Sequence, residues 1–74
     1  MPAFFLDVKS NGRLLNRFEV GFSVGNEAIE HSRDLAGRLR QRHFPYQADL
    51  VIVVLDGSGR QIHQEFVFPA SQLP

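Results

Sequence analysis

One short segment of this chain has the residue types and the spacing of a catalytic turn. Gly21-Phe22-Ser23-Val24-Gly25 follows the Gly-x-Ser-x-Gly pattern, in which a strained turn between a strand and a helix exposes a nucleophilic serine. That chemistry also needs a larger parallel sheet, an oxyanion loop, and an acid and a histidine placed after the serine. His31 and His43 lie on or just past the helix that Ser23 would begin. We therefore interpret the segment as a turn with a capping serine.

The other titratable residues lack a spacing that would assemble a site. His31, His43 and His63 do not show the i, i+4 or i, i+2 separation that places two metal ligands on one side of a helix or strand. The chain has no cysteine, which removes thiol catalysis and the usual structural zinc sites. Nothing in the spacing pairs the carboxylates that lie on or beside strands, which are Asp7, Asp49, Asp56 and Glu65. We predict no catalytic residue, no metal and no cofactor.

Positive charge gathers in the second half of the predicted helix. Arg38, Arg40 and Arg42 lie there, and arginine pairs well with phosphate groups. One interpretation is a contact with a small anion or a nucleic acid. The other is that these cations complement the negative end of the helix dipole. The chain has eight basic and eight acidic residues, whereas a nucleic-acid-binding domain is usually basic overall, so we favour the second interpretation.

These side chains must be positioned by a small set of predicted elements, of which the first is a hairpin. Residues 3–9 and 13–20 alternate apolar and polar side chains and form its two strands. Asn11-Gly12 joins them, because both residues tolerate the positive φ of a type I′ turn. The alternation predicts that Leu14, Asn16, Phe18 and Val20 share one face of the second strand.

An amphipathic helix follows the hairpin. Small and apolar residues recur every three or four positions and form one stripe, consisting of Ala28, Ile29, Ser32, Leu35, Ala36 and Leu39. Either Ser23 or Asn26 supplies the capping oxygen at its start. Phe44 precedes Pro45 and is biased out of the α region, so the helix should end near His43. We interpret Gly37, within the stripe, as a close approach of the helix to the sheet.

A second hairpin completes the predicted fold. Residues 48–55 and 60–68 are its strands, and Asp56-Gly57-Ser58-Gly59 is its turn. The result is an α+β domain over residues 1–69, a two-layer β-β-α-β-β arrangement in which one helix packs on a four-stranded sheet of two hairpins, followed by a flexible tail over 70–74. The strand order stays open between 2-1-3-4 and a grasp-like order. One face of the third strand joins an expected core of Phe4, Leu6, Val8, Phe18, Val20, Ile62, Phe66 and Phe68.

Residues 50–55 read Leu-Val-Ile-Val-Val-Leu and are apolar on both faces of a strand. One helix covers only one face, so the other face requires a cover, most simply a second copy of the chain. A 74-residue chain also has a marginal core, which favours association. We therefore predict a homodimer that uses the outer sheet face or an edge strand, with the candidate contacts Phe5, Leu15, Val51, Val53, Leu55 and Val67.

The chain resembles a family of short bacterial proteins of unknown function. Its opening Met1-Pro2-Ala3-Phe4-Phe5, its Asp56-Gly57-Ser58-Gly59-Arg60 turn and its closing Phe66-Val67-Phe68-Pro69 match that family in kind. Members usually carry Leu-Pro-Asp before the helix, where this chain has Phe22-Ser23-Val24. The resemblance implies the same β-β-α-β-β pattern, but it brings no established activity and no functional residues.

No apolar run in the sequence approaches the roughly 20 residues needed to span a bilayer, and the absence of cysteine fits a reducing cytoplasm. We expect a non-enzymatic, homodimeric interaction or regulatory module in the cytoplasm. The alternative is a binder of nucleic acid or an anionic ligand that uses Arg38, Arg40 and Arg42.

Overall fold

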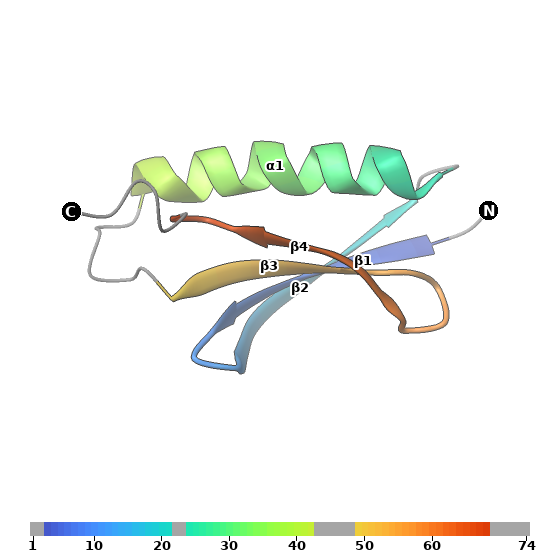
Figure 1. Ribbon diagram of the computed structural model, residues 1–74, viewed down its shortest axis with the longest axis horizontal. Helices are drawn as coiled ribbons and strands as arrows, with labels where there is room; N and C mark the ends of the chain where they lie inside the picture. Colours follow the sequence, from blue (N-terminus) through green and yellow to red (C-terminus); the bar gives the residue numbers. More distant parts are fainter. Residues whose placement is uncertain (1–2, 22–23, 43–48, 69–74) are drawn as a thin grey trace.

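The computed structural model describes residues 3–21, 24–42 and 49–68. Five elements follow one another along the chain: β1 (Ala3–Ser10), β2 (Arg13–Gly21), α1 (Gly25–Arg42), β3 (Leu50–Leu55) and β4 (Gln61–Phe66). The strands form one antiparallel sheet in the order β2-β1-β3-β4, and α1 lies across one of its faces (Figure 1). The predicted two-layer α+β fold is confirmed, and the strand order is 2-1-3-4. The predicted tail over 70–74 lies outside the described residues.

The first turn has the backbone that its two residues predict. Asn11 has a φ of 54° and Gly12 a φ of 75°, the left-handed values that a type I′ turn needs at both central positions. The turn leads β2 back along β1, so that Leu6 lies opposite Phe18 and Asp7 lies opposite Arg17. Opposite residues share a face of the sheet, so this register decides which β2 side chains lie beneath the helix.

A bulge interrupts β2 near the turn. Val8 pairs with Asn16 and Lys9 pairs with Leu14, so Leu15 is an extra residue on β2. Lys9 points away from the helix, since its neighbour Val8 belongs to the core, and Leu14 shares that outward face. The prediction that Leu14 shares a face with Phe18 is therefore wrong, because the bulge reverses the alternation.

The helix lies on the sheet through small side chains. Ala28, Ser32 and Ala36 are fully buried, and Leu35 and Leu39 pack against the core beside them. Small residues at this interface allow the helix backbone to approach the sheet closely. Ser32 satisfies its buried hydroxyl by donating to the carbonyl of Ile29 at 2.6 Å. The predicted stripe therefore faces the sheet.

The ends and the glycine of the helix differ in part from the predictions. The helix ends at Arg42, close to the predicted end near His43, which itself lies outside the described residues. Asn26 lies within the helix and is not its cap, whereas Ser23 lies outside the described residues. A Cβ added at Gly37 would meet no atom within 4 Å, so Gly37 does not mark a close approach to the sheet.

The apolar strand β3 lies inside the sheet, between β1 and β4. Leu50, Ile52 and Val54 face the helix and are fully buried together with Leu6 of β1. On the outer face, which we define as the sheet face away from α1, Val53 is also nearly buried. This central position explains why the strand is apolar on both sides.

The predicted alternation of β4 is wrong over most of the strand. The register shifts between Val54 and Leu55, which pair with His63 and Gln61, so that Ile62 is an extra residue. Beyond this bulge His63 and Glu65 lie on the helix side of the sheet, opposite Val54 and Ile52.

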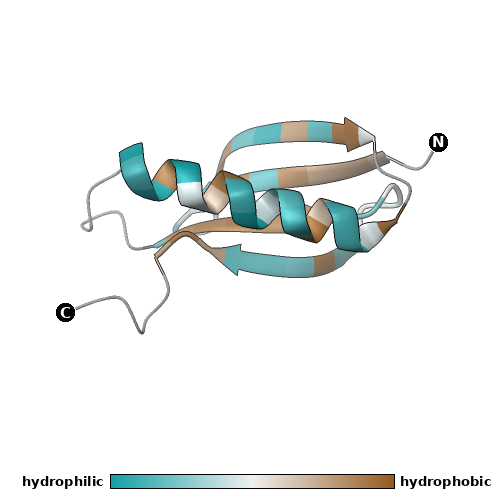
Figure 2. Cartoon of the chain, turned by 90° about the horizontal axis from the view of Figure 1, so that it is seen from above, coloured by the Kyte–Doolittle hydropathy of each residue, from teal (hydrophilic) through white to brown (hydrophobic). Residues whose placement is uncertain are grey.

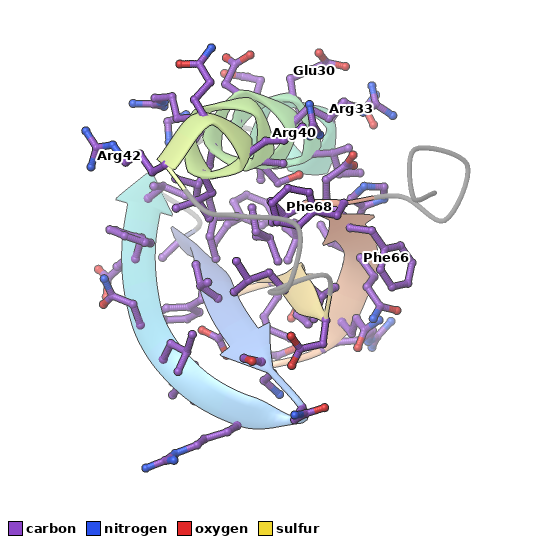
Figure 3. The ribbon with its side chains drawn as sticks, turned by 90° about the vertical axis from the view of Figure 1, so that its left-hand side faces the viewer. Glu30, Arg33, Arg40, Arg42, Phe66 and Phe68 are labelled. Carbon is purple, nitrogen blue, oxygen red and sulfur yellow. The ribbon has the colours of Figure 1, made fainter. Side chains whose placement is uncertain are left out.

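Of the two phenylalanines that follow, only Phe66 differs from the prediction. Phe66 lies opposite Val51 on the outer face and is 52% exposed, although it was expected in the core. Val67 is instead fully buried, and Phe68 is buried beside it, as predicted. Figure 3 shows Phe68 beneath the helix and Phe66 directed away from the space between helix and sheet.

The helix leaves one edge strand uncovered. It packs on β1, β3 and β4, while β2 extends beyond it on the far side of β1 (Figure 2). Phe18 faces the helix side of the sheet, as predicted, because it lies opposite the fully buried Leu6. It is nevertheless 40% exposed, since α1 packs chiefly on β1, β3 and β4 and does not complete its burial.

Candidate functional site

The centre of the outer face is occupied by an ion pair. Arg17 of β2 donates from Nε and Nη2 to the two carboxylate oxygens of Asp7 of β1, at 2.7 and 2.8 Å. The Asp7 side chain is only 3% exposed, and the Arg17 guanidinium also lies 5.4 Å from the centre of the Phe5 ring. The hydrogen bonds from Arg17 to Asp7 raise the pKa of Arg17 above its usual value. The middle of the outer face is therefore covered by two charged side chains.

The six predicted contact residues fall into three groups. Phe5, Val51, Val53 and Leu55 share the outer face, as their register on β1 and β3 shows. Leu15 is exposed at the bulge of β2. Val67 belongs to the core beneath the helix, so its assignment to the outer face is wrong. The predicted alternation of β4 failed there because of the bulge at Ile62.

Sequence reasoning missed two exposed apolar residues of this surface. Leu14 and Phe66 stand at opposite ends of one outward row, which runs Leu14, Lys9, Val51, Phe66 across the four strands. Both are about half exposed. Each was assigned to the other face because a bulge shifts the alternation of its strand, and a bulge has no clear signal in a single sequence.

The edge strand β2 carries the largest share of exposed apolar side chains. Leu14, Leu15 and Phe18 are 48%, 53% and 40% exposed, and all three lie on this nine-residue strand. Within the described part of the chain, β2 pairs with β1 on one side only. A long edge strand with exposed apolar residues is a template for pairing with another strand.

The three arginines of the predicted anion contact do not share one surface. Arg40 donates from Nε to the backbone carbonyl of Val67 at 2.7 Å, which ties the helix to the end of β4. Arg38 and Arg42 are exposed, and a separation of two residues places Arg40 on the opposite side of the helix from both. Figure 3 shows Arg40 and Arg42 directed apart. Arg40 therefore has a structural partner.

A polar cluster joins the helix to β4. His63 and Glu65 are linked by a 2.8 Å contact between Nε2 and Oε1, and Arg33 lies 3.7 Å from the same carboxylate oxygen. Arg33 also donates to Glu30 at 2.7 Å. The members of this cluster satisfy one another at the rim of the helix–sheet interface, which is a structural role.

The predicted turn residues also have structural roles. Ser23 lies outside the described residues. A Cβ at Gly25 would come within 3.1 Å of Cδ1 of Ile62, so Gly25 is suited to close packing.

The turn of the second hairpin is held by Asp56, which accepts hydrogen bonds through Oδ1 from Ser58 N, Ser58 Oγ and Arg60 N. Chiefly the Ser58 hydroxyl, and then the Arg60 amide, lower the pKa of Asp56. Asp49 accepts from the Ser10 hydroxyl at 2.6 Å.

Neither a metal centre nor a membrane span is found in the described segments. Among residues 3–21, 24–42 and 49–68, no three His, Cys, Asp or Glu side chains are grouped so that they could hold a metal ion. An open depression of about 350 Å³ lies along the helix, lined by Asn26, Glu27, Glu30, His31 and Asp34. In the same segments no helix combines the length and the apolar character needed to cross a membrane.

The fold and this surface define a small two-layer α+β protein with apolar side chains displayed on its sheet. No family model, curated protein or solved structure matches the chain. Its function must therefore be argued from the surface itself.

Proposed function

We propose that this protein is a non-enzymatic interaction or regulatory module that acts as a homodimer. The observation that carries the proposal is the apolar surface of the sheet, where Leu14, Leu15, Phe18 and Phe66 are each at least 40% exposed. A domain of this size buries a smaller fraction of its surface than a larger domain does, so covering side chains of this kind with a second copy would add stability. The formal net charge of zero presents no overall repulsion between copies.

The alternative, a binder of nucleic acid or an anionic ligand, has weaker support. Of the three arginines predicted to contact an anion, Arg40 already donates to the carbonyl of Val67. This leaves Arg38 and Arg42 as the two exposed candidates, on a chain whose net charge is zero. Binding to phosphates by a few surface arginines would be weak and strongly dependent on salt. The absence of cysteine agrees with a protein that functions in a reducing compartment. We propose that this compartment is the bacterial cytoplasm.

The oligomeric state tests the proposal. Sedimentation velocity or light scattering at roughly 50 µM, a concentration at which a modest dimer is populated, should give twice the chain mass of 8.4 kDa, which is 16.8 kDa. A single species of 8.4 kDa over a hundredfold range of concentration would contradict it. The alternative is tested by binding to a labelled oligonucleotide at low salt. A loss of binding in an Arg38→Ala, Arg42→Ala variant of unchanged stability would favour the alternative.

A further inference from the structure

We infer that two copies of the chain join edge to edge through β2, antiparallel and centred on Phe18, so that their sheets form one continuous sheet. This inference rests on the proposed homodimer and names its surface and its register. The two-fold axis would stand perpendicular to the sheet, which places both helices on the same side. The exposed Phe18 side chains would then meet between the two helices.

The backbone of β2 shows which groups are directed to the free edge of the sheet. The Arg17 amide donates to Oδ1 of its own neighbour Asn16 at 2.9 Å, so it does not bond to β1 and is directed to the free edge. Groups of the same parity, including those of Glu19, alternate toward the same edge. A symmetric antiparallel pair can bond only if outward-facing residues oppose each other, so the axis must pass through a residue and not between two residues.

Charge and regularity then select one residue as the centre. An axis through Arg17 would oppose two arginines, and an axis through Glu19 would oppose two glutamates, both of which are unfavourable. An axis through Asn16 would carry the pairing into the bulge at Leu15. An axis through Phe18 uses only residues 16–20, which lie within the regular part of the strand.

The Phe18 register makes the two strands complementary on both faces. Arg17 lies opposite Glu19 of the second copy, and this pair occurs twice by symmetry. Arg17 uses Nε and Nη2 for Asp7, which leaves Nη1 for a second carboxylate. Glu19 has no hydrogen bond or ion pair with another described residue. On the helix side Phe18 packs against its own copy, because residues opposite each other in a non-hydrogen-bonded pair lie closest.

The other edge, β4, offers less to a second copy. Its bulge at Ile62 leaves only residues 63–66 in a regular register with β3. The charged groups that would oppose each other there, His63 and Glu65, already pair within the chain, and Arg33 lies against the same carboxylate. The free carboxylate of Glu19, the unused Nη1 of Arg17 and the longer regular stretch are all on β2.

Single cysteines read the register directly, because the chain contains no cysteine of its own. Phe18→Cys would place two thiols opposite each other, within the Cα separation of about 4.4–6.8 Å that a disulfide needs. Asn16→Cys is the matched control, since two copies of residue 16 would lie roughly 13 Å apart along the strands. Mild oxidation should cross-link most of the Phe18→Cys variant into a dimer on a non-reducing gel and leave the Asn16→Cys variant largely uncross-linked.

A charge variant gives an independent readout. Glu19→Arg would oppose Arg17 of the second copy, and it should weaken dimerisation at least tenfold without affecting the fold, because Glu19 has no partner within the described chain. Gln64→Arg, which introduces the same side chain at an exposed position of β4 and changes the charge by one unit where Glu19→Arg changes it by two, should leave the dimer unchanged.

The outcomes separate the inference from the proposal beneath it. A wild-type dimer that cross-links through residue 16 and not 18, or through neither, overturns the inference and leaves the homodimer standing. A Glu19→Arg variant that stays dimeric also overturns it. A wild-type chain that is monomeric throughout overturns both.

Discussion

Arg17 reaches from β2 across the outer face of the sheet and holds both carboxylate oxygens of Asp7, at 2.7 and 2.8 Å. The pair stands in the middle of the face that the apolar residues Phe5, Val51 and Leu55 surround. A second copy packed face to face would have to bury this pair completely, and the loss of hydration of two charges opposes that contact. A copy added at the edge of β2 leaves one side of Arg17 in water. The ion pair therefore favours the edge over the face.

The Asp7–Arg17 pair also makes a prediction about stability. Arg17→Ala should lower the free energy of unfolding by about 2 kcal/mol, because it leaves a buried carboxylate without a partner. The double variant Asp7→Val, Arg17→Val should cost less, since it removes both charges and keeps strand-forming residues. Urea denaturation at one fixed protein concentration measures both variants. A double variant less stable than Arg17→Ala alone would contradict this account.

The features that follow from local sequence were the ones that could be predicted. The Asn11-Gly12 turn, the stripe of α1 and the end of the helix depend on residues that are close neighbours in the chain. The strand order, in which β3 lies between β1 and β4, depends on contacts between distant segments, so local sequence does not specify it. The half-exposed state of Phe18 depends likewise on where the helix lies, which its own strand does not specify.

The glycines should respond to alanine with opposite signs. Gly37→Ala should raise the free energy of unfolding by about 0.5–1 kcal/mol, because glycine is a poor helix former and the added Cβ meets open space. Gly12→Ala should lower it by about 1 kcal/mol, since a φ of 75° strains any residue with a Cβ although the space around it is also open. Thermal and urea unfolding of both variants test this, and a destabilised Gly37→Ala variant would mean that the helix lies closer to a neighbour at this position.

Asp56 should make the free energy of unfolding depend on pH in the acid range. Its hydrogen bonds from Ser58 and Arg60 lower its pKa in the folded state below the ordinary value of 3.8. The unfolded chain therefore binds the proton first, so the stabilisation is complete above that value and is lost as the pH falls through the folded pKa. Asp56→Asn keeps an oxygen acceptor but no charge. The wild type should exceed this variant in stability at neutral pH, and the difference should shrink in acid; a difference independent of pH would contradict the prediction.

Arg40 and Arg42 should separate a structural role from a surface charge. Arg40→Ala should lower the free energy of unfolding by about 1–2 kcal/mol, because the Val67 carbonyl loses a charged donor at 2.7 Å. Arg42→Ala should change it by less than about 0.5 kcal/mol, since the side chain is exposed and its interaction with the helix dipole is weak. Equal effects in urea denaturation would show that the contact with Val67 contributes little.

Val67 and Phe66 test the bulge that reversed the predicted faces of β4. The predicted faces assume an unbroken alternation from residue 60 to residue 68, but Ile62 is an extra residue and β4 ends at Phe66. Val67 is fully buried among Leu50 and its neighbours, so Val67→Ala should lower the free energy of unfolding by about 2 kcal/mol. Phe66 is half exposed, so Phe66→Ala should cost about 1 kcal/mol or less despite the larger side chain removed.

The predicted alternation requires the reverse ranking of the two variants, because it makes Phe66 the core residue. Denaturation of the two variants at one protein concentration therefore decides between the two faces, and a greater loss from Phe66→Ala would restore the simple alternation.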